Sequence, residues 1–123
     1  MMLIVLIGLA LGLILGFKSP LVVPVAYARY LSIALLATLD SVFGGVRASL
    51  EGKFDNTIFV TGFFSNAVLA ALLTFIGDRL GVELYNAAVF AFGYRIFQNL
   101  GMSRMLLLKD VRIPDEVKLR TRQ

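Results

Sequence analysis

The feature that most constrains the fold of this chain is an uncharged run of twenty residues, 57–76. As a helix, at about 1.5 Å per residue, this run measures about 30 Å, which matches the hydrocarbon core of a bilayer. Composition agrees with a membrane setting, because 59% of the 123 residues are hydrophobic and only 16% are charged. A soluble domain of this size would leave much of that apolar surface in water. The run therefore predicts a membrane-spanning helix.

Three more apolar stretches are candidates for spans, near 1–17, 25–43 and 84–100. The first lacks the basic start and small-residue cleavage site of a signal peptide, so we expect an uncleaved helix. The last is interrupted by polar and basic residues and could instead lie on the membrane surface. We predict one all-α integral membrane domain, 1–123, a polytopic bundle of about four short transmembrane helices with a basic cytoplasmic tail, 101–123.

The stretch 39–54 combines both charge signs with paired glycines, and we predict a juxtamembrane elbow after the second span. Its candidate residues are Gly44, Gly45, Arg47, Glu51, Gly52 and Lys53. The glycine pair should loosen the helix, and the basic and acidic residues at i and i+4 suit one helical turn. The amides of the pair, beside basic side chains, could hold a phosphate or an anionic lipid head group. The competing interpretation is a structural turn that carries cytoplasmic positive charge.

Several polar side chains fall within the predicted spans, namely Arg29, Asp40, Asn66, Arg95 and Asn99. Such groups are costly in hydrocarbon and usually face protein, water or the interface. Arg29 lies early enough in its span to extend toward the head groups. Asp40 needs a partner, and Arg95 or Arg47 could form a buried polar centre with it. Such a pair could serve a function or only fix the register of the helices.

Two stripes of small residues predict packing faces. Gly8, Gly12 and Gly16 recur at every fourth position, which would let another backbone approach closely. Glycine is also common in membrane helices, so the spacing could be incidental. Thr57, Thr61 and Ser65, with Asn66 beside them, form a small polar face that we expect to point toward a neighbouring helix.

The distribution of charge predicts the orientation in the membrane. With four spans, both termini and the elbow share one side, which carries two basic residues in the elbow and six from Arg104 onward. The opposite side carries Lys18 and Arg79, with Arg29 close to it. Because short cytoplasmic segments are enriched in Lys and Arg, we expect a multi-pass protein of the cell membrane with both termini in the cytoplasm.

The absence of Cys and His narrows the chemistry. No thiolate nucleophile or zinc–thiolate site can form, and the usual base at neutral pH is missing, so we expect no enzyme, metal or cofactor. Nucleic-acid binding is not expected either, because the basic residues lie in or near hydrophobic segments. The expected partners are the lipid bilayer, with a possible anionic lipid, and further copies or a larger membrane protein.

Several motifs resemble the bacterial small basic protein family: the run 39–55, the span 63–76, GDRLGVELY at 77–85 and FGYRIFQNL at 92–100. The resemblance implies a small, basic, membrane-embedded protein without an assigned activity. In some Gram-positive bacteria its gene lies among cell-division genes, which suggests a link to the cell envelope. The positions that match its recurring motifs are Asp40, Gly44, Gly45, Arg47, Glu51, Gly52, Lys53, Arg95 and Asn99.

Two functions fit this sequence. The first is a non-enzymatic membrane protein that packs through its glycine face as an assembly or accessory subunit of the cell envelope, either as a homo-oligomer or beside a larger partner. The alternative is a small oligomeric channel or transporter subunit in which Asp40, Asn66 and Arg95 line a path.

Overall fold

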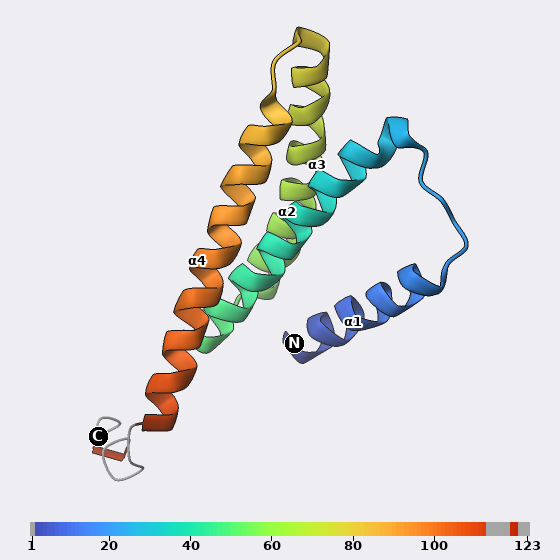
Figure 1. Ribbon diagram of the computed structural model, residues 1–123. Helices are drawn as coiled ribbons and strands as arrows, with labels where there is room; N and C mark the ends of the chain where they lie inside the picture. The colour runs from blue at the N-terminus through green and yellow to red at the C-terminus, as the bar shows by residue number, and fades with distance from the viewer. Residues whose placement is uncertain (1, 113–118, 121–123) are drawn as a thin grey trace.

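The computed structural model describes residues 2–112 and 119–120, and this part of the chain contains helices and no strand. The four helices are α1 (Met2–Lys18), α2 (Val25–Leu50), α3 (Asn56–Leu80) and α4 (Leu84–Arg112), as Figure 1 shows. The all-α prediction is therefore confirmed. Of the predicted basic tail, 101–123, residues 113–118 and 121–123 lie outside the described residues.

Two of the helices, α2 and α3, are long and apolar enough to cross a membrane. α1 is also apolar but has only 17 residues, and the 29-residue α4 does not reach the same apolarity. These two helices suggest that the protein associates with a membrane. They account for two of the roughly four spans predicted from the sequence.

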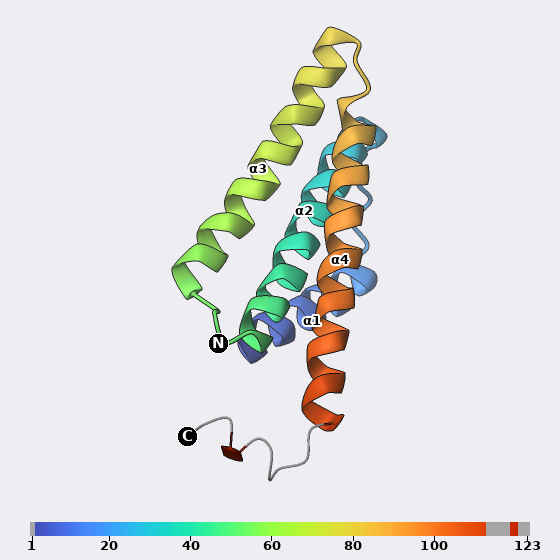
Figure 2. The same cartoon turned by 90° about the vertical axis from the view of Figure 1, so that its left-hand side faces the viewer.

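The helices α2, α3 and α4 form the bundle, with α2 packed against both of the others. Among the described helices, α1 packs against α2 alone, and an extended segment of residues 19–24 joins the two (Figure 1). α4 runs past the end of α2, as Figures 1 and 2 both show. One helix is thus only loosely attached to a three-helix unit.

The centre of the bundle combines one isoleucine with three alanines. Ile33 and Ala37 of α2 meet Ala70 of α3 and Ala88 of α4, and all four are buried. Small residues at crossings let helix backbones approach closely, which is the usual packing mode in membranes. Large apolar side chains lie outside instead: Phe17 is 90% exposed, whereas Asp40 is 1% exposed. This distribution is the reverse of that in a soluble protein.

The predicted elbow begins later than expected. Gly44 and Gly45 lie inside α2, which continues to Leu50. A glycine lowers helix stability by only about 1 kcal/mol, which tertiary packing can override. Here the packing partner is Phe59, because a Cβ on Gly45 would lie 2.9 Å from its Cδ2. The expectation that this glycine pair loosens the helix was wrong.

The α2–α3 turn is organised by Gly52, whose φ of 72° is the left-handed conformation that favours glycine. The Lys53 N–H donates to the Ala48 carbonyl at 2.8 Å, and the Gly52 N–H donates to the Ser49 carbonyl at 3.1 Å. These two bonds form a Schellman motif at the end of α2. The Asp55 side chain then caps α3 by accepting a bond from the Ile58 N–H at 2.9 Å.

Candidate functional site

The polar centre of the bundle is an ion pair between α2 and α4. Arg95 Nη2 lies 3.3 Å from Asp40 Oδ2, and the Arg95 side chain is 55% exposed. Neither carboxylate oxygen of Asp40 accepts a hydrogen bond from a described residue. Of the two partners considered from the sequence, Arg95 is the one that the structure brings to Asp40.

Arg47, the other candidate, is engaged elsewhere. Its Nε donates to Glu51 Oε1 at 3.0 Å, one helical turn further along, and its Nη1 donates to Asn99 Oδ1 at 3.4 Å. The contact with Asn99 gives a second polar connection between α2 and α4. The spacing of Arg47 and Glu51 is readable from the sequence, whereas the Asn99 contact depends on the crossing of the helices.

The hydroxyl stripe on α3 does not face the bundle. Thr57, Thr61 and Ser65 are exposed, so the prediction that they point toward a neighbouring helix was wrong. Thr61 instead donates to the carbonyl of Thr57 in its own helix at 2.7 Å, a common way for a helical hydroxyl to be satisfied. Asn66 does reach across, since its Nδ2 donates to Ser41 Oγ of α2 at 3.3 Å.

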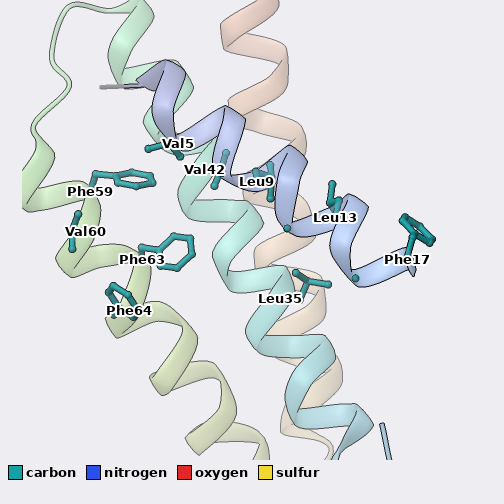
Figure 3. A pocket seen from close by; sticks show the side chains of 13 residues that line it. Val5, Leu9, Leu13, Phe17, Leu35, Val42, Phe59, Val60, Phe63 and Phe64 are labelled. Carbon is teal, nitrogen blue, oxygen red and sulfur yellow. The ribbon is translucent and has the colours of Figure 1, made fainter. Parts of the chain in front are cut away.

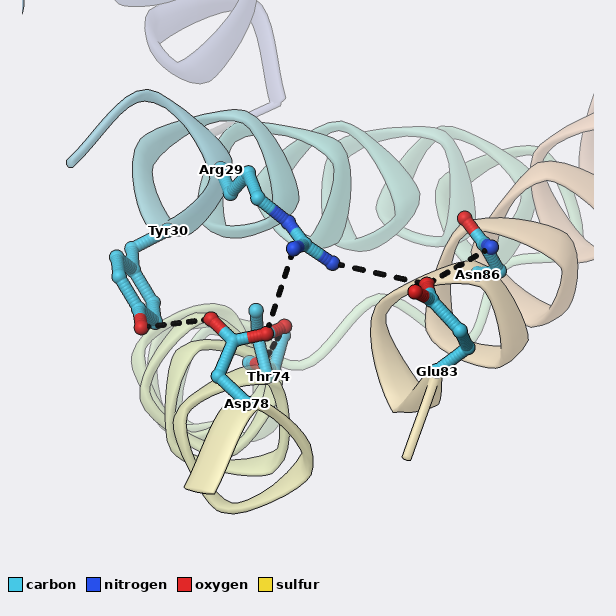
Figure 4. Close-up of polar contacts among 7 residues, drawn as sticks. Arg29, Tyr30, Thr74, Asp78, Glu83 and Asn86 are labelled. Atoms are coloured by element: carbon cyan, nitrogen blue, oxygen red, sulfur yellow. Dashed lines mark hydrogen bonds and ion pairs between the residues drawn. The ribbon is translucent and has the colours of Figure 1, made fainter. Parts of the chain in front are cut away.

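A second polar cluster lies at the end of the bundle away from the α2–α3 turn (Figure 4). Arg29 Nη1 lies 3.4 Å from Asp78 Oδ1, and its Nη2 lies 3.8 Å from Glu83 Oε2. The Tyr30 hydroxyl donates to Asp78 Oδ2 at 2.8 Å. From the sequence we favoured head groups as the neighbours of Arg29, and its partners Asp78 and Glu83 were not identified. The sequence did contain a signal for this cluster. Consecutive spans run in opposite directions, so the acidic residues after the third span must lie at the same end of the bundle as the start of the second span.

A cavity of about 210 Å³ lies between α2 and α3 beside their turn, and Arg95 of α4 also borders it. Its wall includes Asp40, Ser41, Gly44, Gly45, Lys53, Asp55 and Gly62, together with Ala48, Ile58 and three phenylalanines. Arg47, Glu51 and Gly52 of the predicted elbow are not on this wall. The predicted phosphate cradle does not form, because backbone N–H groups within a helix are bonded to carbonyls of the preceding turn.

A larger groove of about 750 Å³ separates α1 from the bundle. Leu9 of α1, Val42 of α2 and Phe63 of α3 are among its lining residues (Figure 3). Gly8, Gly12 and Gly16 lie on its α1 side, and, apart from the adjoining residues and backbone of α1 itself, no described atom lies within 4 Å of a Cβ built on any of them. The glycine face therefore opens onto the groove and packs against no other described helix.

Comparison with known proteins identifies the family. Residues 23–108 match the family model described as "Protein of unknown function (DUF1290)". The chain is 50% identical over 102 residues to the "Small basic protein" of Bacillus subtilis (strain 168), covering 83% of this chain and 84% of that protein. The chain belongs to the bacterial small basic protein family. The resemblance seen in its motifs is thereby confirmed.

More distant members of the family are also similar along most of their length. An uncharacterised protein of Mycobacterium tuberculosis (strain ATCC 25618 / H37Rv) is 44% identical over 102 residues, covering 81% of this chain and 84% of the relative. An uncharacterised protein of Mycobacterium bovis has the same identity and coverage. No solved structure matches the chain significantly. Family membership therefore brings a class of protein and no assigned activity.

Proposed function

We propose that this chain is a non-enzymatic, multi-pass membrane protein that acts as an assembly or accessory subunit of the bacterial cell envelope. In this role the groove between α1 and the bundle receives a transmembrane helix of another subunit. The observation that carries the proposal is the glycine face of α1, which borders an apolar groove and meets no described atom within 4 Å of its Cβ positions.

The spacing of charges on α2 supports insertion in a bilayer. Arg29 and Arg47 are eighteen residues apart, about 27 Å along a helix, which is close to the thickness of roughly 30 Å of a hydrocarbon core. Asp40 is the only formal charge between them, and it is buried. Large apolar side chains are also exposed on α1 and α4, such as Phe17 at 90% and Phe90 at 77%. Such surfaces favour contact with lipid, so we include α1 and α4 among the helices in the bilayer.

The groove suits a helix because of what lines its two sides. On α1 the residues at every fourth position are glycines, which permit close backbone approach and favourable van der Waals contact. On the bundle side the walls are the apolar residues Leu35, Val42, Val60 and three phenylalanines. An apolar helix that enters this space would meet no unpaired polar group on the lining, so packing would determine the affinity.

The test is chemical crosslinking in the native membrane followed by native mass spectrometry of the purified complex. We expect a defined complex, containing either a second copy or another envelope protein. Gly12→Leu should abolish it, because a leucine side chain at this position would keep the entering helix away from the backbone of α1. The matched control is Gly93→Leu on α4, which also has no described atom within 4 Å of its Cβ position and lies outside the groove. A complex that survives Gly12→Leu, or a protein that remains a monomer, would contradict the proposal.

The channel hypothesis receives less support from this geometry. Asp40 and Arg95 border the smaller cavity, but Asn66 is not on its wall and is engaged with Ser41. Ion flux in liposomes that depends on Asp40 would favour a channel over an accessory subunit.

A further inference from the structure

The smaller cavity contains a carboxylate with unused hydrogen-bonding capacity. Asp40 is 1% exposed, yet neither of its oxygens accepts a hydrogen bond from the described part of the chain. An ionised carboxylate offers about four lone-pair sites, and leaving them empty in a buried position is costly. Arg95 contributes charge at 3.3 Å from one oxygen only. Both oxygens are closed off by their surroundings, so a ligand would bring its hydrogen-bond donors to Asp40 by displacing Arg95, the half-exposed side chain that contacts it.

The neighbouring wall favours a positively charged donor. Phe54, Phe59 and Phe63 all border the cavity, and their rings follow one another with centroid distances of 5.6 and 6.0 Å. The faces of aromatic rings attract ammonium groups. A buried carboxylate beside an aromatic wall is thus suited to an organic ammonium group.

The turn end of the cavity carries a lysine beside the Asp55 carboxylate, which is engaged by the Ile58 N–H as the cap of α3. Lys53 borders the cavity and forms no ion pair with any residue that the structure describes. Arg95 also borders the cavity, so a second cation is available for an anionic group. Asp40 lies thirteen residues before Lys53, so the cavity extends from the turn into the span, which is the direction in which a head group would enter from the bilayer surface.

We propose that this cavity binds a head group in which a primary ammonium is linked to a phosphate, as in an aminophospholipid. The ammonium donates to Asp40, and the phosphate faces Lys53 and Arg95. Gly62, which borders the cavity and has open space at its Cβ position, leaves the room that this requires. The inference rests on the membrane insertion of the proposed function and is independent of the helix that enters the groove of α1.

Phosphatidylethanolamine and phosphatidylcholine separate this chemistry cleanly. Both carry the phosphate, but the ammonium of the first has three N–H donors, whereas the trimethylammonium of the second has none. Native mass spectrometry of the full chain with equimolar amounts of the two lipids, matched in acyl chains, should show phosphatidylethanolamine retained about tenfold better. This ratio corresponds to one charge-assisted hydrogen bond.

Substitutions assign the preference to the cavity. Asp40→Asn should bring the ratio close to one, and Lys53→Gln should weaken both lipids equally because they share the phosphate. Gly62→Leu keeps the charges and fills space, since no described atom lies within 4 Å of its Cβ position, so it should remove the preference even if Asp40→Asn fails to fold. Gly12→Leu, in the other groove, should leave the ratio unchanged.

Competition with soluble O-phosphoethanolamine identifies the source of the head group. Displacement of the lipid would support the chemistry with a free ligand as its source, and absence of displacement would support the lipid. Equal retention of the two lipids would overturn the inference and mean that the cavity holds only water. A preference that persists in both Asp40→Asn and Gly62→Leu would also overturn it. Either result could occur with the crosslinked complex intact, so the two proposals fail separately.

Discussion

At the scale of single residues, the glycines of this chain have different roles. A Cβ on Gly77 would lie 2.7 Å from the Val82 carbonyl oxygen and 2.8 Å from the Leu84 Cβ. Val82 belongs to the connection that follows α3, and its N–H donates to the Gly77 carbonyl at 2.9 Å, whereas Leu84 is the first residue of α4. Gly93 in α4 meets no described atom within 4 Å of its Cβ position. Only the first of these two glycines is required by its surroundings.

Gly77→Ala should therefore destabilise the protein by about 1–3 kcal/mol, because the added methyl group overlaps backbone that cannot move without disturbing the end of α3. Gly93→Ala should be neutral or stabilising by up to about 1 kcal/mol, since alanine favours the helix. The measurement is unfolding of each purified variant in the same detergent. Equal stability of the two variants would contradict this distinction.

At the scale of the elements, polar contacts determine which helices meet. Asp40 and Arg95 join α2 to α4, Arg47 and Asn99 join the same helices nearer the α2–α3 turn, and Arg29 joins α2 to the acidic residues at the other end. In hydrocarbon, such contacts fix register because the alternative is an unmatched charge. Arg29, Asp40 and Arg47 thus make polar contacts at three different positions along the length of α2.

Arg95→Gln should destabilise the bundle by about 2 kcal/mol, less than the roughly 3–5 kcal/mol of a fully buried pair, because the Arg95 side chain is 55% exposed. The double substitution Asp40→Asn with Arg95→Gln should recover part of this loss, since no unmatched carboxylate then remains. Arg47→Gln, in a less buried pair, should cost at most about 1 kcal/mol. Unfolding of these three variants and of Asp40→Asn alone in detergent measures the coupling. A double variant less stable than either single variant would exclude it.

The existence of the helices and the residues at which they begin could be predicted from the sequence, but the residues at which α2, α3 and α4 end could not. The apolar runs indicate α1, α2 and α3 directly, whereas α2 continues past its glycine pair to Leu50 and α4 continues to Arg112. The cause at Gly45 is the ring of Phe59, a contact between two helices that local propensity does not contain. The predicted orientation of Thr57, Thr61 and Ser65 was also wrong. A helical hydroxyl can bond to a carbonyl of its own helix, as Thr61 does, and then needs no partner on a neighbouring helix.

At the scale of the whole molecule, the least predictable feature was the position of α1. Its glycine spacing indicates a packing face, but the sequence does not say whether the partner is another part of the same chain. In the folded chain α1 contacts only α2 among the described helices and leaves its glycine face on an open groove. The pairing of Asp40 with a cationic residue could be proposed from cost alone, while the choice of Arg95 required the helix crossing.

Both proposals depend on the way in which the helices cross the bilayer. Four crossings with cytoplasmic termini put the α2–α3 turn inside the cell, and the connections after α1 and α3 outside it. The chain has no cysteine, so single cysteines introduced at Ser19, Ser49 and Val82 give an unambiguous readout of side. Ser49 and Val82 are exposed, which suits labelling.

The measurement is labelling of these single-cysteine variants with a membrane-impermeant maleimide in intact cells and in permeabilised cells. We predict that Ser19→Cys and Val82→Cys react in intact cells, whereas Ser49→Cys reacts only after permeabilisation. If Ser49→Cys and Val82→Cys react equally under both conditions, then α3 does not cross the membrane. The assignment of the groove and the cavity to a bilayer would then be wrong.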